Sequence, residues 1–106
     1  MTTRDDASSE VLRILVVEDE ELDRLGVRRC IHQSGLRATV DEAATAAEAF
    51  DRLSRATYHC LLLDYYIPGV DGLAFLQHIR HIAPEVPIVM FTGRGDEEIE
   101  IGRAHV

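Results

Sequence analysis

Residues 61–72, LLLDYYIPGVDG, decide the fold. They continue the short apolar run 60–63, which is typical of a strand buried on both faces of a sheet. The ionisable residue Asp64 follows this run at once, and Pro68 and Gly69 then predict a turn. A carboxylate at the end of the most apolar strand calls for an explanation, because a buried charge costs free energy unless something pairs with it.

The composition indicates one soluble domain with an acidic surface. The chain has 106 residues, of which 46% are hydrophobic and 28% charged, and its net charge is −8. This charge argues against direct binding to nucleic acid or to an anionic membrane, and it is compatible with a site for a metal cation. No apolar run approaches the ~20 residues that a membrane span needs. All 11 basic residues are arginines.

The start of the chain and its cysteines indicate a cytoplasmic protein. Residues 1–10, MTTRDDASSE, are polar and predict a disordered tail, which leaves residues 11–106 as the folded domain. No secretory signal is present in this segment. We therefore predict that Cys30 and Cys60, which lie in apolar periodic segments, are reduced thiols in the core.

Apolar runs and helical patterns alternate along the chain. Strands are predicted at 13–17, 37–43, 60–63 and 87–92, and helices at 22–33, 46–54, 72–83 and from 97 to the end. Strict alternation with continuous apolar strands predicts an α/β fold, with a parallel sheet and helices on both faces. The connections between strands are expected to be right-handed.

Local signals set the helix ends and the buried faces. Thr45 with Glu48 forms a capping box. Helix 22–33 carries an apolar stripe at Val27, Cys30 and Ile31, with its arginines Arg24, Arg28 and Arg29 on other faces. In helix 72–83 the corresponding stripe consists of Phe75, Ile79 and Ile82.

Several polar residues fall at the ends of the predicted strands. The first strand is followed by Glu18 and Asp19, the third by Asp64, and the fourth by Thr92 and Gly93. Sheets of this kind bind ligands beyond the carboxyl ends of their strands. If the first and third strands are neighbours, three carboxylates meet, and their repulsion raises acid pKa values unless a cation intervenes. Mg²⁺ suits such oxygen ligands, and Mn²⁺ is expected to substitute for it.

Other acids have simpler interpretations. Asp71 and Asp96 stand where helix caps belong, and Glu20, Glu21 and Asp23 form an acidic first helical turn. A lone acid after a strand is often a cap or turn residue of this kind. The convergence of three strand ends, together with a hydroxyl group, favours a binding site instead.

Three motifs carry a family resemblance. They are ILVVEDE (14–20), LLLDYYIPGVDG (61–72) and PIVMFTGRG (87–95). In this order and spacing, the chain resembles the receiver domain of bacterial two-component response regulators from Ile14 to about His105. The resemblance implies the flavodoxin-like doubly wound sheet, whose strand order is 2-1-3-4-5.

The resemblance also implies a role for each acid. Asp64 is expected to be the phosphoacceptor, which attacks a phosphohistidine on a histidine kinase or phosphotransfer protein. Asp19 is expected to bind Mg²⁺ directly and Glu18 through water, and the main-chain carbonyl of Tyr66 is a further expected ligand.

Thr92 is expected to hydrogen-bond the phosphoryl oxygens, and Gly93 to leave them room. The chain is then a signalling domain, with at most self-phosphorylation and self-dephosphorylation activity. The alternative is a receiver-like interaction module that works without phosphorylation.

The chain departs from the family pattern at one end. The family carries a lysine at the end of a fifth strand, whereas this chain has no lysine, and its predicted sheet is 2-1-3-4 without the fifth strand and fifth helix. Two explanations stay open: a piece of a longer regulator, or a naturally degenerate receiver. In either case the fourth strand becomes an uncharged edge, which predicts a homodimer through this region.

Overall fold

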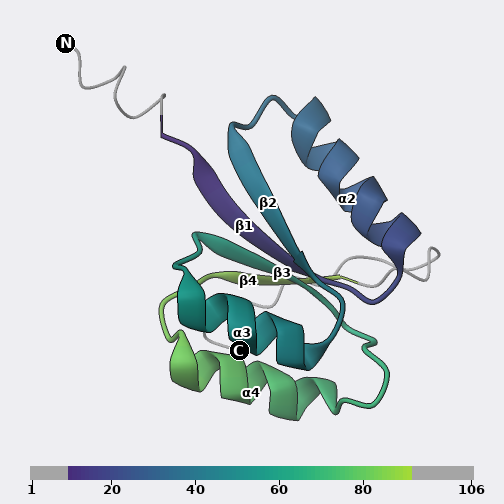
Figure 1. The fold of residues 1–106 in the computed structure, drawn as a ribbon, viewed down its shortest axis with the longest axis vertical. Coiled ribbons are helices and arrows are strands. Elements are labelled where there is room, and N and C mark those ends of the chain that lie inside the picture. Colours follow the sequence, from purple (N-terminus) through teal and green to yellow (C-terminus); the bar gives the residue numbers. More distant parts are fainter. Residues whose placement is uncertain (1–9, 92–106) are drawn as a thin grey trace.

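The computed structural model describes residues 10–91 as four strands and three helices in strict alternation (Figure 1). The elements are β1 (Leu12–Val17), α2 (Glu21–Gln33), β2 (Ala38–Ala43), α3 (Ala46–Arg55), β3 (Cys60–Asp64), α4 (Gly72–Ile82) and β4 (Ile88–Phe91). Each predicted strand and each of the first three predicted helices is confirmed to within two residues at either end. The predicted last residue of the fourth strand, Thr92, and the helix predicted after Asp96 lie outside the described residues.

The four strands form one parallel sheet in the order β2-β1-β3-β4. Val17 of β1 is in register with Leu63 of β3, and Asp64 is in register with Phe91 of β4. The predicted flavodoxin-like, doubly wound order is therefore confirmed for these strands. Because β1 and β3 are neighbours, the residues that follow them emerge side by side at one edge of the sheet.

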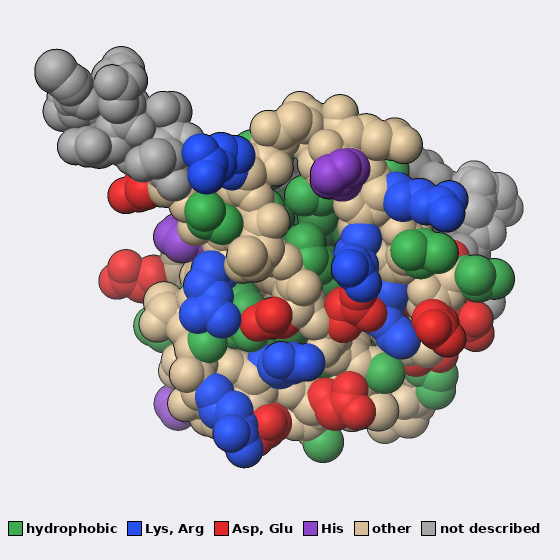
Figure 2. Space-filling view, turned by 45° about the horizontal axis from the view of Figure 1, so that its top comes forward, with side chains coloured by type: hydrophobic (Ala, Val, Ile, Leu, Met, Phe, Trp, Pro, Cys, Tyr) green, Lys and Arg blue, Asp and Glu red, His purple; other side chains and the backbone are tan. Residues whose placement is uncertain are grey.

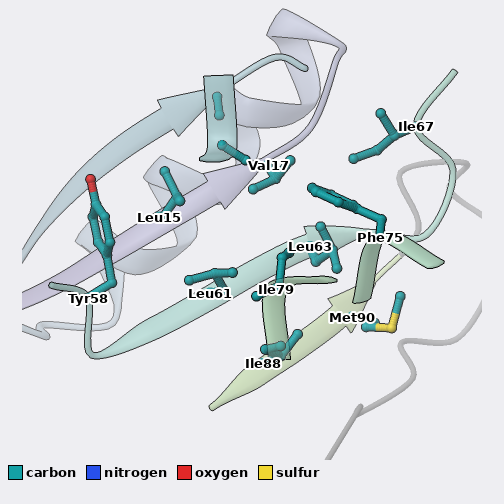
Figure 3. Close-up of a cluster of buried hydrophobic side chains, with 12 residues drawn as sticks. Leu15, Val17, Tyr58, Leu61, Leu63, Ile67, Phe75, Ile79, Ile88 and Met90 are labelled. Carbon is teal, nitrogen blue, oxygen red and sulfur yellow. The ribbon is translucent and has the colours of Figure 1, made fainter. Parts of the chain in front are cut away.

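The main core lies between one face of the sheet and the helices α3 and α4, which run side by side on that face (Figures 1 and 3). Alternate strand residues point into it, as the period of a strand requires. These residues are Leu15, Val17, Ala43, Leu61, Leu63, Ile88 and Met90. The helices contribute Ala49, Phe75 and Ile79, and the rings of Phe50 and Phe75 meet edge to face with centroids 5.2 Å apart. Ile82 was predicted on the buried stripe but is 46% exposed, since burial ends one turn before α4 does.

The predicted caps of α3 and α4 are present. The Thr45 hydroxyl accepts the Glu48 N–H at 3.1 Å, and the Glu48 carboxylate accepts the N–H of Ala44 at 2.8 Å. In a standard capping box this second bond goes to the cap residue itself, one position later. The Asp71 carboxylate accepts the N–H of Leu73 at 3.2 Å. Both helices therefore begin where side chains satisfy their first N–H groups.

Helix α2 lies on the opposite face, and the predicted burial of its apolar stripe is wrong in part. None of its residues is fully buried, and Cys30 is exposed, so this thiol is not in the core. The two other members of the stripe are partly buried, and on the same side of the helix Arg24 and Arg28 both pair with Glu42 of β2. At ~100° per residue, Cys30 lies ~120° around the helix from Arg24 and points away from the sheet. Cys60 is partly buried, and both cysteines are free.

A groove separates the second half of α2 from β2. Figure 2 shows it as a hollow with an apolar floor and with histidine and arginine side chains at its rim. Its apolar lining includes Leu25, Leu36 and Val40, and Arg29 and His32 contribute polar groups. Within residues 10–91, no helix is both long enough and apolar enough to cross a membrane.

Candidate functional site

The carboxylates of Glu18, Asp19 and Asp64 converge at the carboxyl edge of the sheet. Glu18 and Asp19 directly follow β1, and Asp64 is the last residue of β3. One oxygen from each of the three side chains lies within 4.8 Å of the others. The adjacency of β1 and β3 produces this cluster, because it brings together residues that are 46 positions apart in the sequence.

Main-chain N–H groups orient two of these carboxylates. The N–H of Glu20 donates to Glu18 Oε2 at 2.9 Å, and the N–H of Tyr66 donates to Asp64 Oδ1 at 3.1 Å. The backbone of Glu18 is itself held, since its N–H donates to the carbonyl of Ala43 at 3.0 Å. Both carboxylates therefore have an orientation that the local turn sets.

Glu18 is the most constrained of the three acids. Its side chain is 1% exposed, and its Oε1 is buried without a hydrogen bond from any donor among residues 10–91. Burial raises the pKa of Glu18 to about 8, against the opposing effect of the Glu20 N–H, and the neighbouring Asp64 and Asp23 raise it further. The direction predicted for an acid pKa in the cluster is found at Glu18, although burial raises this pKa more than the repulsion on which the prediction rested.

The donor set fits a hard divalent cation. All three groups are carboxylates, and the unsatisfied Oε1 of Glu18 lies in an acidic cluster where positive charge would relieve the repulsion. The cluster opens into a pocket of ≈ 400 Å³, whose wall includes Leu22, Tyr66 and Pro68. A ligand larger than an ion therefore has room beside Asp64.

Of the three other predicted site residues, the structure describes only Tyr66. Tyr66 lines the same pocket, and its side chain is half exposed. Thr92 and Gly93 lie outside the described residues. Phe91, which precedes them, pairs with Asp64 in the sheet, and its carbonyl accepts the N–H of Tyr65 at 2.7 Å.

The sequence did not predict a role near the site for two residues, Arg24 and Glu42. Arg24 donates through Nη1 to the main-chain carbonyl of Glu18 at 2.8 Å and through Nε to Glu42 at 2.8 Å. The apolar periodicity of the helix predicts Arg24 on a face away from the core, and it gives no sign of partners that come from other segments of the chain. Glu42 could have pointed to this contact, but an acid in a predicted strand is usually a solvated side chain.

The fold and the acidic pocket together define a flavodoxin-like domain with a ligand site at the carboxyl edge of its central strands. Residues 14–104 match the family model of the response regulator receiver domain. The chain belongs to this family, and it is a receiver domain of the two-component response regulators.

The curated relatives are longer than this chain. The phosphate regulon transcriptional regulatory protein PhoB of Escherichia coli (strain K12) is 36% identical over 88 residues, which are 81% of this chain and 38% of PhoB. PhoB of Klebsiella pneumoniae is 38% identical over the same shares. The chain therefore spans well under half the length of these relatives.

Solved structures show the same fold. The isolated receiver domain of RcsB from Salmonella enterica serovar Typhimurium superposes with a TM-score of 0.72 at 20% identity, covering 82% of this chain and 65% of that one. The response regulator TrrA of Thermotoga maritima was solved in complex with Mg²⁺-BeF. It superposes with a TM-score of 0.70 at 28% identity, and the match covers 80% of this chain and 72% of TrrA.

Proposed function

We propose that Asp64 accepts a phosphoryl group from the phosphohistidine of a histidine kinase or phosphotransfer protein. The observation that supports this role is the pocket in which Asp64 lies beside Glu18 and Asp19, with one Glu18 oxygen unsatisfied. Strand β3 fixes Asp64 at the floor of the pocket, and the N–H of Tyr66 orients its carboxylate. Rigid alignment of this kind is the main requirement of phosphoryl transfer.

The transfer balances without a further reactant. An oxygen of Asp64 forms a bond to phosphorus, the P–N bond of the phosphohistidine breaks, and the released imidazole nitrogen takes up a proton from water. We propose that Mg²⁺ is held by Glu18, Asp19, Asp64 and the main-chain carbonyl of Tyr66, with Mn²⁺ as a substitute. The bound cation would neutralise charge on the phosphoryl oxygens and on the acids.

The remaining parts of the proposal follow the family. Thr92 would hydrogen-bond the phosphoryl oxygens, and Gly93 would leave them room. Residues 11–106 would form the receiver domain and 1–10 a tail, in a cytoplasmic protein that does not itself contact nucleic acid. Beyond accepting the phosphoryl group, the domain would catalyse only its own phosphorylation by small donors and its own dephosphorylation.

Incubation with acetyl phosphate and Mg²⁺ tests the proposal. We expect the mass of the intact protein to rise by one phosphoryl group, and this gain to be lost in Asp64→Asn and in the presence of EDTA. Asp51→Asn is the matched control, because Asp51 is an exposed helix residue outside the pocket. A phosphoryl group that still appears on Asp64→Asn would show that another residue is the acceptor.

A further inference from the structure

We propose that Arg24 is a positioning residue for the cation site, and that Glu42 holds it in place. This inference rests on the proposed function, because it concerns the same three carboxylates. The side chain of Arg24 donates hydrogen bonds to a main-chain carbonyl of the β1–α2 turn and to an acid of β2, and not to the three carboxylates. Its role is therefore to hold the segment that carries Glu18 and Asp19.

Arg24 binds the β1–α2 turn at two points. Its guanidinium donates to the carbonyl of Glu18 at 2.8 Å, and its main-chain N–H donates to the carbonyl of Glu20 at 3.0 Å. Between these points the N–H of Glu20 binds back to the carboxylate of Glu18 at 2.9 Å. Asp19 lies inside this closed set of hydrogen bonds, so the turn that presents it is restrained from both sides.

Glu42 fixes the other end of the guanidinium. Its Oε1 accepts from Arg24 Nε and its Oε2 from Arg28 Nη1, both at 2.8 Å. The two arginines lower the pKa of Glu42, although partial burial opposes them, so the carboxylate stays charged over the neutral range. A planar guanidinium can serve two partners in fixed directions, whereas a lysine ammonium at this position cannot reproduce that geometry.

Arg24 is much less exposed to solvent than Arg28. Its side chain is 16% exposed, compared with 55% for Arg28. Taking an ion pair out of water seldom adds net stability, because desolvation offsets the attraction between the charges. A partly buried pair that ends on the backbone of the acidic turn is better explained by the geometry that it imposes there.

Arg28 provides a matched control for Arg24. Both are arginines of α2 that pair with Glu42, but only Arg24 reaches the Glu18 carbonyl. Removing either arginine deletes one positive charge near the acids, and electrostatics alone would then strengthen Mg²⁺ binding in both variants. Loss of positioning weakens binding instead, and it does so only when Arg24 is changed.

The experiment is a calorimetric titration of the full chain with Mg²⁺, together with thermal unfolding of the metal-free proteins. We expect Arg24→Ala to raise the Kd by about tenfold, in the range found for groups that orient metal ligands, and Arg28→Ala to leave it unchanged or lower. The Kd of Glu42→Gln for Mg²⁺ should lie between those of Arg24→Ala and Arg28→Ala. Arg24→Lys, which keeps the charge and the length of the side chain, is the second variant in case the alanine variant does not fold, and it should also bind Mg²⁺ more weakly than wild type.

Three outcomes would overturn the proposal in different ways. If wild type binds Mg²⁺ and the Arg24 variants bind as Arg28→Ala does, Arg24 has no positioning role and the proposed function stands. If wild type itself takes up no Mg²⁺, the proposed cation site is wrong, and the role of Arg24 falls with it. A drop in unfolding temperature without a change in Kd likewise assigns Arg24 to stability alone.

Discussion

The substitution Glu18→Gln should stabilise the metal-free domain at neutral pH and weaken its binding of Mg²⁺. The Glu18 carboxyl is buried, one of its oxygens is unsatisfied, and its pKa is raised from 4.5 to about 8. A glutamine keeps an oxygen for the N–H of Glu20 and adds an N–H₂ group that can donate to Asp64. It removes the charge whose burial is unfavourable.

The sign of the pH dependence follows from the direction of this shift. Between 4.5 and about 8 the folded state keeps a proton on Glu18 that the unfolded state has lost, so folding is favoured by low pH. The contribution is fully present below the unfolded pKa and is lost as the pH rises through the folded pKa. Between about pH 5.5 and about pH 7.5 the metal-free wild type should lose about 2–3 kcal/mol from this group, at about 1.4 kcal/mol per unit.

Urea unfolding in EDTA at both pH values measures this effect. The informative quantity is the pH effect in wild type minus that in Glu18→Gln, because the subtraction removes the contributions that the two proteins share. Glu85→Gln, which removes an exposed carboxylate away from the pocket, is the control and should behave as wild type. Saturating Mg²⁺ should restore stability to wild type at the higher pH and do so less for Glu18→Gln. An identical pH slope in wild type and Glu18→Gln would refute the reasoning.

Three further predictions concern other parts of the molecule. Tyr66→Asn should shorten the lifetime of phosphorylated Asp64, because the half-exposed ring at the pocket restricts the access of water to the phosphoryl group. Mass spectrometry would follow the decay of the phosphorylated protein, and an unchanged lifetime would contradict the prediction. Tyr58→Phe should cost about 1–2 kcal/mol in urea unfolding, because the buried hydroxyl donates to Asp41, whereas Tyr65→Phe, half exposed, should cost little. Among the described strands β4 pairs only with β3, so we expect two chains to associate through this edge of the sheet. Gel filtration with light scattering should show a dimer, and Val89→Lys should favour the monomer. A wild-type monomer at micromolar concentration counts against the prediction.

The helix boundaries show where sequence patterns suffice. Thr45 and Asp71 cap their helices through bonds to N–H groups two or three residues away. Both partners lie in one short segment, so their spacing in the sequence is also their spacing in space. The same holds for the apolar runs of β1 and β3, whose burial follows from their composition.

Helix α2 shows where such patterns fail. In its predicted stripe, Val27 and Ile31 are partly buried but Cys30 is exposed. On the side that faces the sheet, the helix also places Arg24 and Arg28. Which side of a helix is buried depends on what packs against it. Here the partner is Glu42 of β2, and nothing in the helix sequence identifies it.

From the residues alone came the alternation of strands and helices, the parallel sheet, and the three acids at strand ends. These depend on periodicity and on a general rule for where parallel sheets bind ligands. The family resemblance predicted the strand order that puts β1 beside β3, and the structure confirms it. The burial that raises the pKa of Glu18 and the clamp of Arg24 on the acidic turn were settled only by the tertiary structure. Each of them depends on contacts between distant segments, and the energy of such a contact is not a property of either segment by itself.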